Sequence, residues 1–256
     1  AGQQAGASSS TRALFGMGGQ ASPGTKQNVI QFVTIATTGN ATDFGDRTVT
    51  LNGPGGLANQ TRAVFAGGGA PVPQSNVMDF VTIASAGNAQ DFGDMTSANK
   101  NPAGMASPTR GLFVHGGDPK TNVIDFITIA TAGNAQDFGD TTVAMEGAIA
   151  ASSTTRGIIG GGLVSPAEIN NIMFITIATT GNATDFGDLT QARQEGAGIS
   201  NSIRACFASG GVPSPNYNII DFVTIATTGD ATDFGDTLTS FGYRGGASDS
   251  HGGLTE

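Results

Sequence analysis

Short apolar runs alternate along the whole chain with glycine-rich and polar turns. In residues 76–84 (Asn-Val-Met-Asp-Phe-Val-Thr-Ile-Ala), β-branched and aromatic residues occupy both alternating faces. This pattern is typical of a strand that is buried on both sides. The Gly-Asn turn that follows favours a hairpin to a second strand over residues 89–95. Upstream, residues 61–66 form a third predicted strand that ends at three glycines, and residues 51–60 can supply a fourth.

The same pattern occurs five times. The phrase Phe-[Val/Ile]-Thr-Ile-Ala recurs with spacings of 48, 46, 48 and 48 residues, beginning at Phe32, Phe80, Phe126, Phe174 and Phe222. The phrase Asp-Phe-Gly-Asp follows in step and begins at Asp43, Asp91, Asp137, Asp185 and Asp233. An arginine precedes one apolar run of each unit, at Arg12, Arg62, Arg110, Arg156 and Arg204. Four short strands in about 48 residues are typical of one blade of a β-propeller.

We therefore predict an all-β fold, a single five-bladed β-propeller that spans residues 1–256. Its four-stranded repeats cover approximately residues 11–60, 61–108, 109–154, 155–202 and 203–251. Segment 239–251 resembles both segment 191–202 and segment 1–11. We therefore expect the termini to close the ring, with one terminus completing the blade that the other begins, because this removes open sheet edges.

Composition narrows the possible functions. The chain has 40 glycines and only 12% charged residues, but its 15 phenylalanines can build a core, so neither disorder nor long helices are expected. Proteins that bind nucleic acid need a cluster of Lys and Arg side chains to contact the phosphates. The net charge of −9 therefore argues against direct binding of nucleic acid. No apolar run approaches the length of a membrane-spanning helix, so no membrane insertion is expected.

The repeat resembles a known family. Its glycine pair, the acidic residue in the next strand (Asp79, Asp125 and Asp221), the Thr-Gly turn and the arginine are similar to kelch-type propeller repeats. Kelch units usually have a tryptophan after the turn, where this chain has Phe44, Phe92, Phe138, Phe186 and Phe234. The phrase Thr-Ile-Ala-Thr-Thr-Gly-Asn-Ala-Thr-Asp-Phe-Gly-Asp resembles repeats in virion structural proteins of marine tailed phages, particularly those that infect cyanobacteria.

This resemblance implies a non-enzymatic structural protein located in the virion, as a component of a tail, a fibre or the capsid decoration. Its expected partners are other virion proteins, and a role in host attachment through a surface glycan or protein is compatible with it. The two histidines, His115 and His251, form no catalytic or metal-binding pattern, so we expect neither enzyme activity nor a cofactor. Two alternatives stay open, a carbohydrate-binding propeller lectin and a kelch-like adaptor that binds protein partners.

Two repeated polar patterns offer chemistry. The five arginines could bind an anion as a ring, but pairing of each arginine with a repeated aspartate is the favoured interpretation. Asn40, Asp43 and Asp46, with their equivalents in the other units, have side-chain oxygens that could hold Ca²⁺. Capping of turns by these side chains is the favoured alternative, because the alternating Asp-x-Asp-x-Asp pattern of calcium loops is absent.

The units differ most in the loop that follows the glycines at the end of the arginine-containing strand. In a propeller all five of these loops emerge on one face, and loops on a rigid scaffold often carry recognition. Candidate binding residues in or beside them are Lys26, Gln74, His115, Lys120, Glu168 and Tyr217. Tolerated surface loops without a binding role are the alternative.

Overall fold

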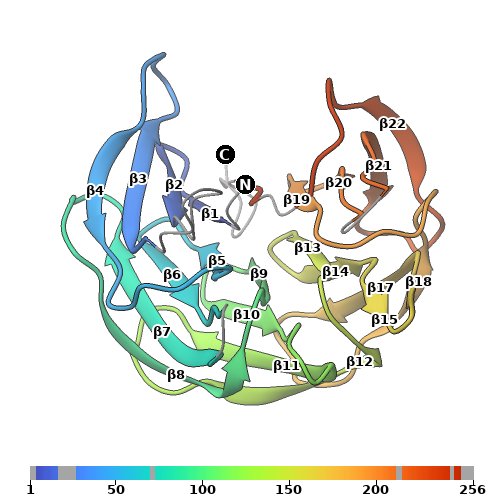
Figure 1. Ribbon diagram of the computed structural model, residues 1–256, viewed down its shortest axis with the longest axis horizontal. Coiled ribbons are helices and arrows are strands. Elements are labelled where there is room, and N and C mark those ends of the chain that lie inside the picture. Colours follow the sequence, from blue (N-terminus) through green and yellow to red (C-terminus); the bar gives the residue numbers. More distant parts are fainter. Residues whose placement is uncertain (1–3, 17–26, 70–72, 212–214, 243–244, 249–256) are drawn as a thin grey trace.

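The computed structural model describes residues 4–16, 27–69, 73–211, 215–242 and 245–248. Within these residues, five antiparallel four-stranded sheets surround a central axis, and each is one blade of a five-bladed β-propeller (Figure 1). The predicted fold class is thereby confirmed. The four strands of each blade follow one another from the axis outwards, in sequence order.

The blades have closely matching strand bounds. Blade one consists of β1 (Ala5–Ser8), β2 (Arg12–Gly16), β3 (Val29–Thr34) and β4 (Thr42–Asp46). Blade two consists of β5 (Gly55–Ala58), β6 (Arg62–Ala66), β7 (Ser75–Thr82) and β8 (Gln90–Asn99). Blade three consists of β9 (Ala103–Ala106), β10 (Arg110–Val114), β11 (Thr121–Thr128) and β12 (Gln136–Met145).

Blade four consists of β13 (Ile149–Ser152), β14 (Arg156–Gly160), β17 (Asn171–Thr176) and β18 (Thr184–Asp188). The short hairpin of β15 (Leu163–Val164) and β16 (Ala167–Glu168) lies in its second loop. Blade five consists of β19 (Ala197–Ser200), β20 (Arg204–Ala208), β21 (Ile219–Thr224) and β22 (Thr232–Asp236). The sheets thus begin one strand earlier than the predicted repeats, because the inner strand pairs with the arginine strand that follows it.

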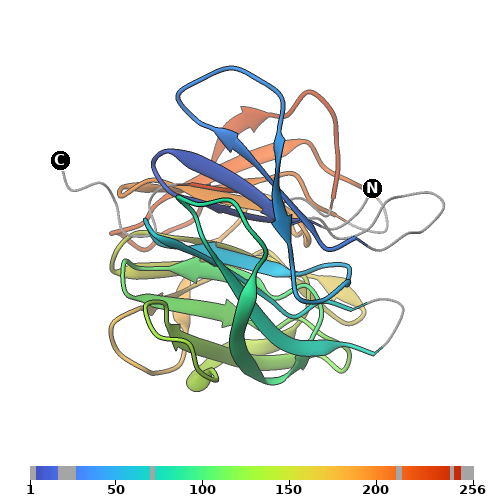
Figure 2. The same cartoon turned by 90° about the vertical axis from the view of Figure 1, so that its left-hand side faces the viewer.

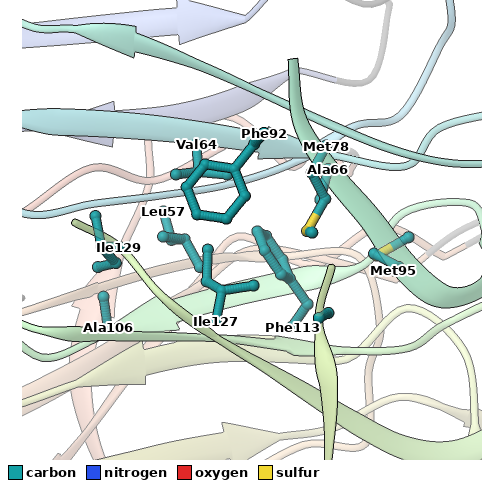
Figure 3. Close-up of a cluster of buried hydrophobic side chains, with 11 residues drawn as sticks. Leu57, Val64, Ala66, Met78, Phe92, Met95, Ala106, Phe113, Ile127 and Ile129 are labelled. Atoms are coloured by element: carbon teal, nitrogen blue, oxygen red, sulfur yellow. The ribbon is translucent and has the colours of Figure 1, made fainter. Parts of the chain in front are cut away.

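The core lies between blades rather than inside any one of them. We call the side of a blade that faces the next blade in sequence its trailing face, and the opposite side its leading face. Four buried apolar clusters fill the four interfaces between consecutive blades. Between blades two and three, Phe92 and Met78 from the trailing face pack with Phe113 and Ile127 from the leading face (Figure 3). This packing explains why both alternating faces of the predicted strands are apolar.

The Asp-Phe-Gly-Asp phrase forms a β-bulge in the outer strand. Gln31 pairs with Asp43 and Ile30 pairs with Gly45, so Phe44 is an extra residue between two pairs. The ring of Phe44 lies edge-on to Phe32, with 5.7 Å between the centroids. Gly45 has a φ of 143°, and a side chain there would collide with the backbone of Gly87 in the next blade. Only glycine suits this position.

Hydrogen bonds also join the outer strand of each blade to the next blade. The N–H of Gly87, in the β7–β8 hairpin, donates to the carbonyl of Phe44 at 2.7 Å, and the N–H of Ala89 donates to the carbonyl of Asp46 at 2.8 Å. In return, the N–H of Asp46 donates to Oδ1 of Asn88 at 3.0 Å. The same three bonds recur at the other three interfaces between consecutive blades. The Gly-Asn turn therefore acts as a clasp on the preceding blade.

Described segments near the two ends of the chain meet at the axis. Residues 245–248 lie between β1 and β19, and the hydroxyl of Ser8 donates to the carbonyl of Ser248 at 2.7 Å. Segments near the two termini thus close the inner layer of the ring, as predicted, whereas no described strand joins blades five and one in the outer layers. The expectation that one terminus completes the other's blade was wrong, because blades one and five each take all four strands from consecutive sequence. In side view the β3–β4 hairpin stands clear of the other blades (Figure 2).

Replacing a phenylalanine of the bulge tests this packing. Phe92 is 2% exposed, so Phe92→Ala should lower the free energy of unfolding by about 3–5 kcal/mol, through lost burial and a cavity. Phe234, at the same place in blade five, is 58% exposed, and Phe234→Ala should cost less than about 1 kcal/mol. Urea denaturation of both variants measures the difference. Equal losses would contradict the packing described here.

Candidate functional site

The five repeated arginines do not pair with aspartates, and that favoured interpretation was wrong. Each guanidinium lies over the phenylalanine ring of its own blade, 4.4 to 4.7 Å from the centroid. In blades one to four, Nη1 of the arginine also donates to an isoleucine carbonyl of the next blade; Arg12, for example, donates to Ile83 at 2.7 Å. Four of the five arginines thus join neighbouring blades, and the alternative of an anion-binding ring has no support.

The repeated aspartates face solvent instead. Asp43, Asp91, Asp137, Asp185 and Asp233 are all exposed. In three of the five blades this carboxylate accepts a hydrogen bond from the glycine N–H of its own bulge, from Gly93, Gly139 and Gly235. The bulge aspartate therefore caps its own turn. It does not bind the repeated arginine, whose guanidinium stacks on a phenylalanine.

The candidate calcium ligands are likewise used as caps. Oδ1 of Asn88 accepts a hydrogen bond from the N–H of Asp46 in the preceding blade. The equivalent residues accept the same bond from the equivalent aspartate of the blade before them: Asn134 from Asp94, Asn182 from Asp140 and Asp230 from Asp188. The asparagine and the aspartates of one unit therefore take part in different contacts. No group of three His, Cys, Asp or Glu side chains converges in the part of the chain that the structure describes. Asn40 has no preceding blade to cap.

Sequence reasoning missed the partners of the buried acids. Asp79, Asp125 and Asp221 lie at 0% exposure in the middle of otherwise apolar strands. Asp79 pairs with Arg47 at 3.0 Å, and Asp221 pairs with Arg193 at 2.9 Å. Because a buried carboxylate requires a partner, the acid in each apolar strand was a signal that a base outside the repeat pattern must be near. Burial lowers the pKa of Arg193, and Asp221 opposes this shift.

In blade three the base is a histidine. Nε2 of His115 lies 2.8 Å from Oδ2 of Asp125, and Nδ1 lies 3.3 Å from the hydroxyl of Ser97. The two ring nitrogens have the opposite partners in a hydrolytic Ser-His-Asp triad, where Nε2 binds the serine and Nδ1 binds the aspartate. Asp79 and Asp221 pair instead with Arg47 and Arg193, which come from the links between blades and not from the position of His115. All three side chains thus provide a polar partner for a buried acid. The predicted role of His115 in a surface loop was therefore wrong, since the side chain is fully buried.

The loops after the glycine stop do share one face. In a sheet of four antiparallel strands, connections alternate between the two ends, so every link from the second strand to the third lies at the same end as the links between blades. The mouth of the axial cavity opens at this end, lined in part by Gln4, Pro54, Asn101 and Glu195. The cavity has a volume of about 120 Å³.

The candidate loop residues mostly bind neighbouring loops. Nε2 of Gln74 donates to the carbonyl of Asp118 at 2.7 Å, which joins blades two and three. Nζ of Lys120 lies 3.0 Å from the carboxylate of Glu146, which also binds Lys100. These side chains interlock the loops around the mouth.

Three further candidates have different settings. Glu168 lies half-buried on β16, whose register pairs it with Leu163. The ring of Tyr217 packs against Gly211 of the same loop. Lys26 lies outside the described residues.

Glu195 is the one strongly perturbed acid at the mouth among the described residues. Burial raises the pKa of Glu195 to about 7, and the nearby Glu146 raises this pKa further, while a hydrogen bond from Asn101 opposes both. Nδ2 of Asn101 donates to Oε1 of Glu195 at 3.0 Å. The backbone N–H of Glu195 donates to the carbonyl of Gly147. The side chain is therefore held over the axis by two loops. Sequence reasoning missed Glu195, because a glutamate does not recur at the equivalent position of the other units.

Comparison with known proteins adds no family. The chain matches no protein-family model and no curated protein sequence. No helix capable of crossing a membrane occurs within the described residues.

The contact of arginine with the next blade has a matched control. Arg110→Ala removes both the stacking on Phe126 and the bond to the carbonyl of Ile177, whereas Arg204→Ala removes only the stacking on Phe222. Arg110→Ala should therefore lower the free energy of unfolding by about 1–3 kcal/mol, and Arg204→Ala by less than about 1 kcal/mol. Chemical denaturation of both variants measures this. A larger loss for Arg204→Ala would contradict the proposed bond.

Glu195 predicts a pH dependence. Its pKa rises from 4.5 to about 7 on folding, so the folded state holds the proton more tightly than the unfolded chain does. The associated stability is complete below pH 4.5 and is lost as the pH rises through 7. Relative to Glu195→Gln, the natural protein should lose up to about 3 kcal/mol of unfolding free energy over this range. Urea denaturation at a series of pH values measures it, and parallel curves for the two proteins would count against the shift.

Proposed function

We propose that this chain is a non-enzymatic structural protein of a tailed-phage virion, a component of the tail, a fibre or the capsid decoration. Within the particle it contacts other virion proteins. A contribution to host attachment, through a glycan or protein at the host surface, belongs to the same proposal.

One observation carries the proposal: the repeated polar chemistry is used to hold blades together. In blades one to four the repeated arginine binds a carbonyl of the next blade. The turn between the third and fourth strands binds the outer strand of the preceding blade, and bulge aspartates cap their own turns. These contacts leave no repeated set of side chains to perform a reaction five times. A rigid body of this kind suits a building element, and the resemblance of its repeat to phage virion repeats supports that role.

The lectin alternative is weakened by the aromatic residues. Sugar sites commonly use an exposed aromatic ring for stacking. The bulge phenylalanines of blades one to four are at most 3% exposed, and only Phe234 of blade five is open. A sugar platform repeated in every blade therefore lacks its aromatic surface. The adaptor alternative has no contact in the described residues that favours it.

Purified phage particles test the proposed function. An antibody against the chain and quantitative mass spectrometry should detect it in nuclease-treated, gradient-purified virions from its source, at a fixed ratio to the major capsid protein. A non-structural phage protein from the same lysate is the matched control and should disappear on purification. If the chain is present in the lysate but is lost from the particles with that control, the proposal is contradicted.

A further inference from the structure

The ring of blades is open at one place. Blades one and five lie on the two sides of an opening at the top of Figure 1. The trailing face of blade five and the leading face of blade one therefore have no blade against them. Both faces carry the same parts that are buried at the other four interfaces.

The exposure of these parts shows the missing contact. Phe234 is 58% exposed on the trailing face of blade five, whereas its equivalent Phe186 is 3% exposed. Ile35 is 52% exposed on the leading face of blade one, whereas its equivalent Ile83 is 1% exposed. Other residues of the two faces are also less buried than their counterparts: Ile199, Cys206 and Ile220 on blade five, and Ala13, Phe15 and Val33 on blade one.

Polar groups at the opening lack the same partners. Within the described residues, the carbonyls of Phe234 and Asp236 receive no bond from a following turn, although those of Phe186 and Asp188 do. The N–H groups of Gly39 and Ala41 find no preceding outer strand to bind there. Arg204 is exposed and has no isoleucine carbonyl in front of it, unlike the other four arginines.

The contacts of the inner strands around the axis show that the opening is one blade wide. Around it, the inner strands pack backbone to backbone at six places, occupied by Gly6, Gly56, Gly104, Ala150, Gly198 and Gly246. Gly246 follows Gly198 by 48 residues, the same interval that separates Gly56 from Gly104. The hydroxyl of Ser8 binds Ser248, much as that of Ser200 binds the carbonyl of Ser152. Five places belong to complete blades, and of the residues that the structure describes the sixth holds the inner segment 245–248.

We propose that the opening is a docking site for one further repeat of this consensus, which enters as a single blade. Such a repeat matches both faces at once. Its isoleucine and Gly-Asn turn would cover Phe234 and bind the outer strand of blade five, while its bulge phenylalanine would cover Ile35. Residues 245–248 already lie where its inner strand belongs, so the occupant supplies the second, third and fourth strands.

Geometry disfavours a second copy of this chain as the occupant. If blade one of another copy entered the sixth place, blade two of that copy would fall where blade one of the first copy lies. The four closed interfaces all have the same arrangement, so this clash follows from the spacing of the ring. A lone blade avoids it.

The experiment uses a repeat that the chain itself provides. A fluorescently labelled polypeptide with the sequence of residues 153–190 contains the three outer strands of blade four and the residues that follow Ser152, the equivalent of Ser248. Added to the full chain, it should bind in saturable one-to-one fashion by fluorescence anisotropy. The same segment joined directly after Ser248 should raise the melting temperature, which covers the case where the free polypeptide aggregates.

Three variants identify the binding surface. Phe234→Ser and Ile35→Ser should leave the melting temperature of the chain alone nearly unchanged, because both side chains are exposed, but each should weaken binding of the polypeptide by about tenfold or more. In the joined form, each should lower the melting temperature. Val143→Ser, which changes an exposed apolar residue of β12 at 38% exposure, should affect neither measurement.

Three results would overturn the proposal. The first is an absence of binding together with a joined segment that leaves the melting temperature unchanged, which means that the ring stays open. The second is binding that Phe234→Ser and Ile35→Ser do not weaken. The third is a dimer of the chain alone in sedimentation that Phe234→Ser dissociates, which means that a second copy covers the opening.

Discussion

The clasp between the Gly-Asn turn of one blade and the outer strand of the preceding blade is the contact on which the ring depends. A single four-stranded sheet with two apolar faces cannot bury either face alone, so each blade is stable only against its neighbours. The clasp fixes their mutual position, since Gly87 and Ala89 donate to the carbonyls of Phe44 and Asp46. The bulge at Phe44 then directs a ring into the interface, and Gly45 allows the two backbones to approach.

This arrangement explains why the chain is rich in glycine and poor in charge. Glycines are needed where outer strand meets turn and where inner strands meet at the axis. Four of the repeated arginines and the side chains at the tips of the turns bind across the interfaces. The buried acids are matched by Arg47, His115 and Arg193, each contributed outside the repeated arginine positions. The features in which the blades differ are the loops around the axial mouth and the exposure of the two uncovered faces.

Much of this fold could be predicted from sequence because its determinants are local and repeated. The two-sided apolar pattern gives the strands, the interval gives the blade, and the copy number gives the ring. Contacts across blades could not be obtained in this way. The partner of Arg12 is a backbone carbonyl, which no residue type announces, and the partners of Asp79 and Asp221 lie outside the repeat pattern. The surroundings of His115 depend on Asp125 and Ser97 meeting in space.

Amide hydrogen exchange at the outer strands tests the clasp most directly. The N–H groups of Asp46, Asp94, Asp140 and Asp188 each donate to a side chain in the turn of the following blade. Asp236 has no such turn beside it in the part of the chain that the structure describes. The account predicts slow exchange at the first four amides and fast exchange at Asp236, measured by NMR. Equal exchange at all five would contradict it, because the outer strands would then be protected, or left open, independently of the neighbouring blade.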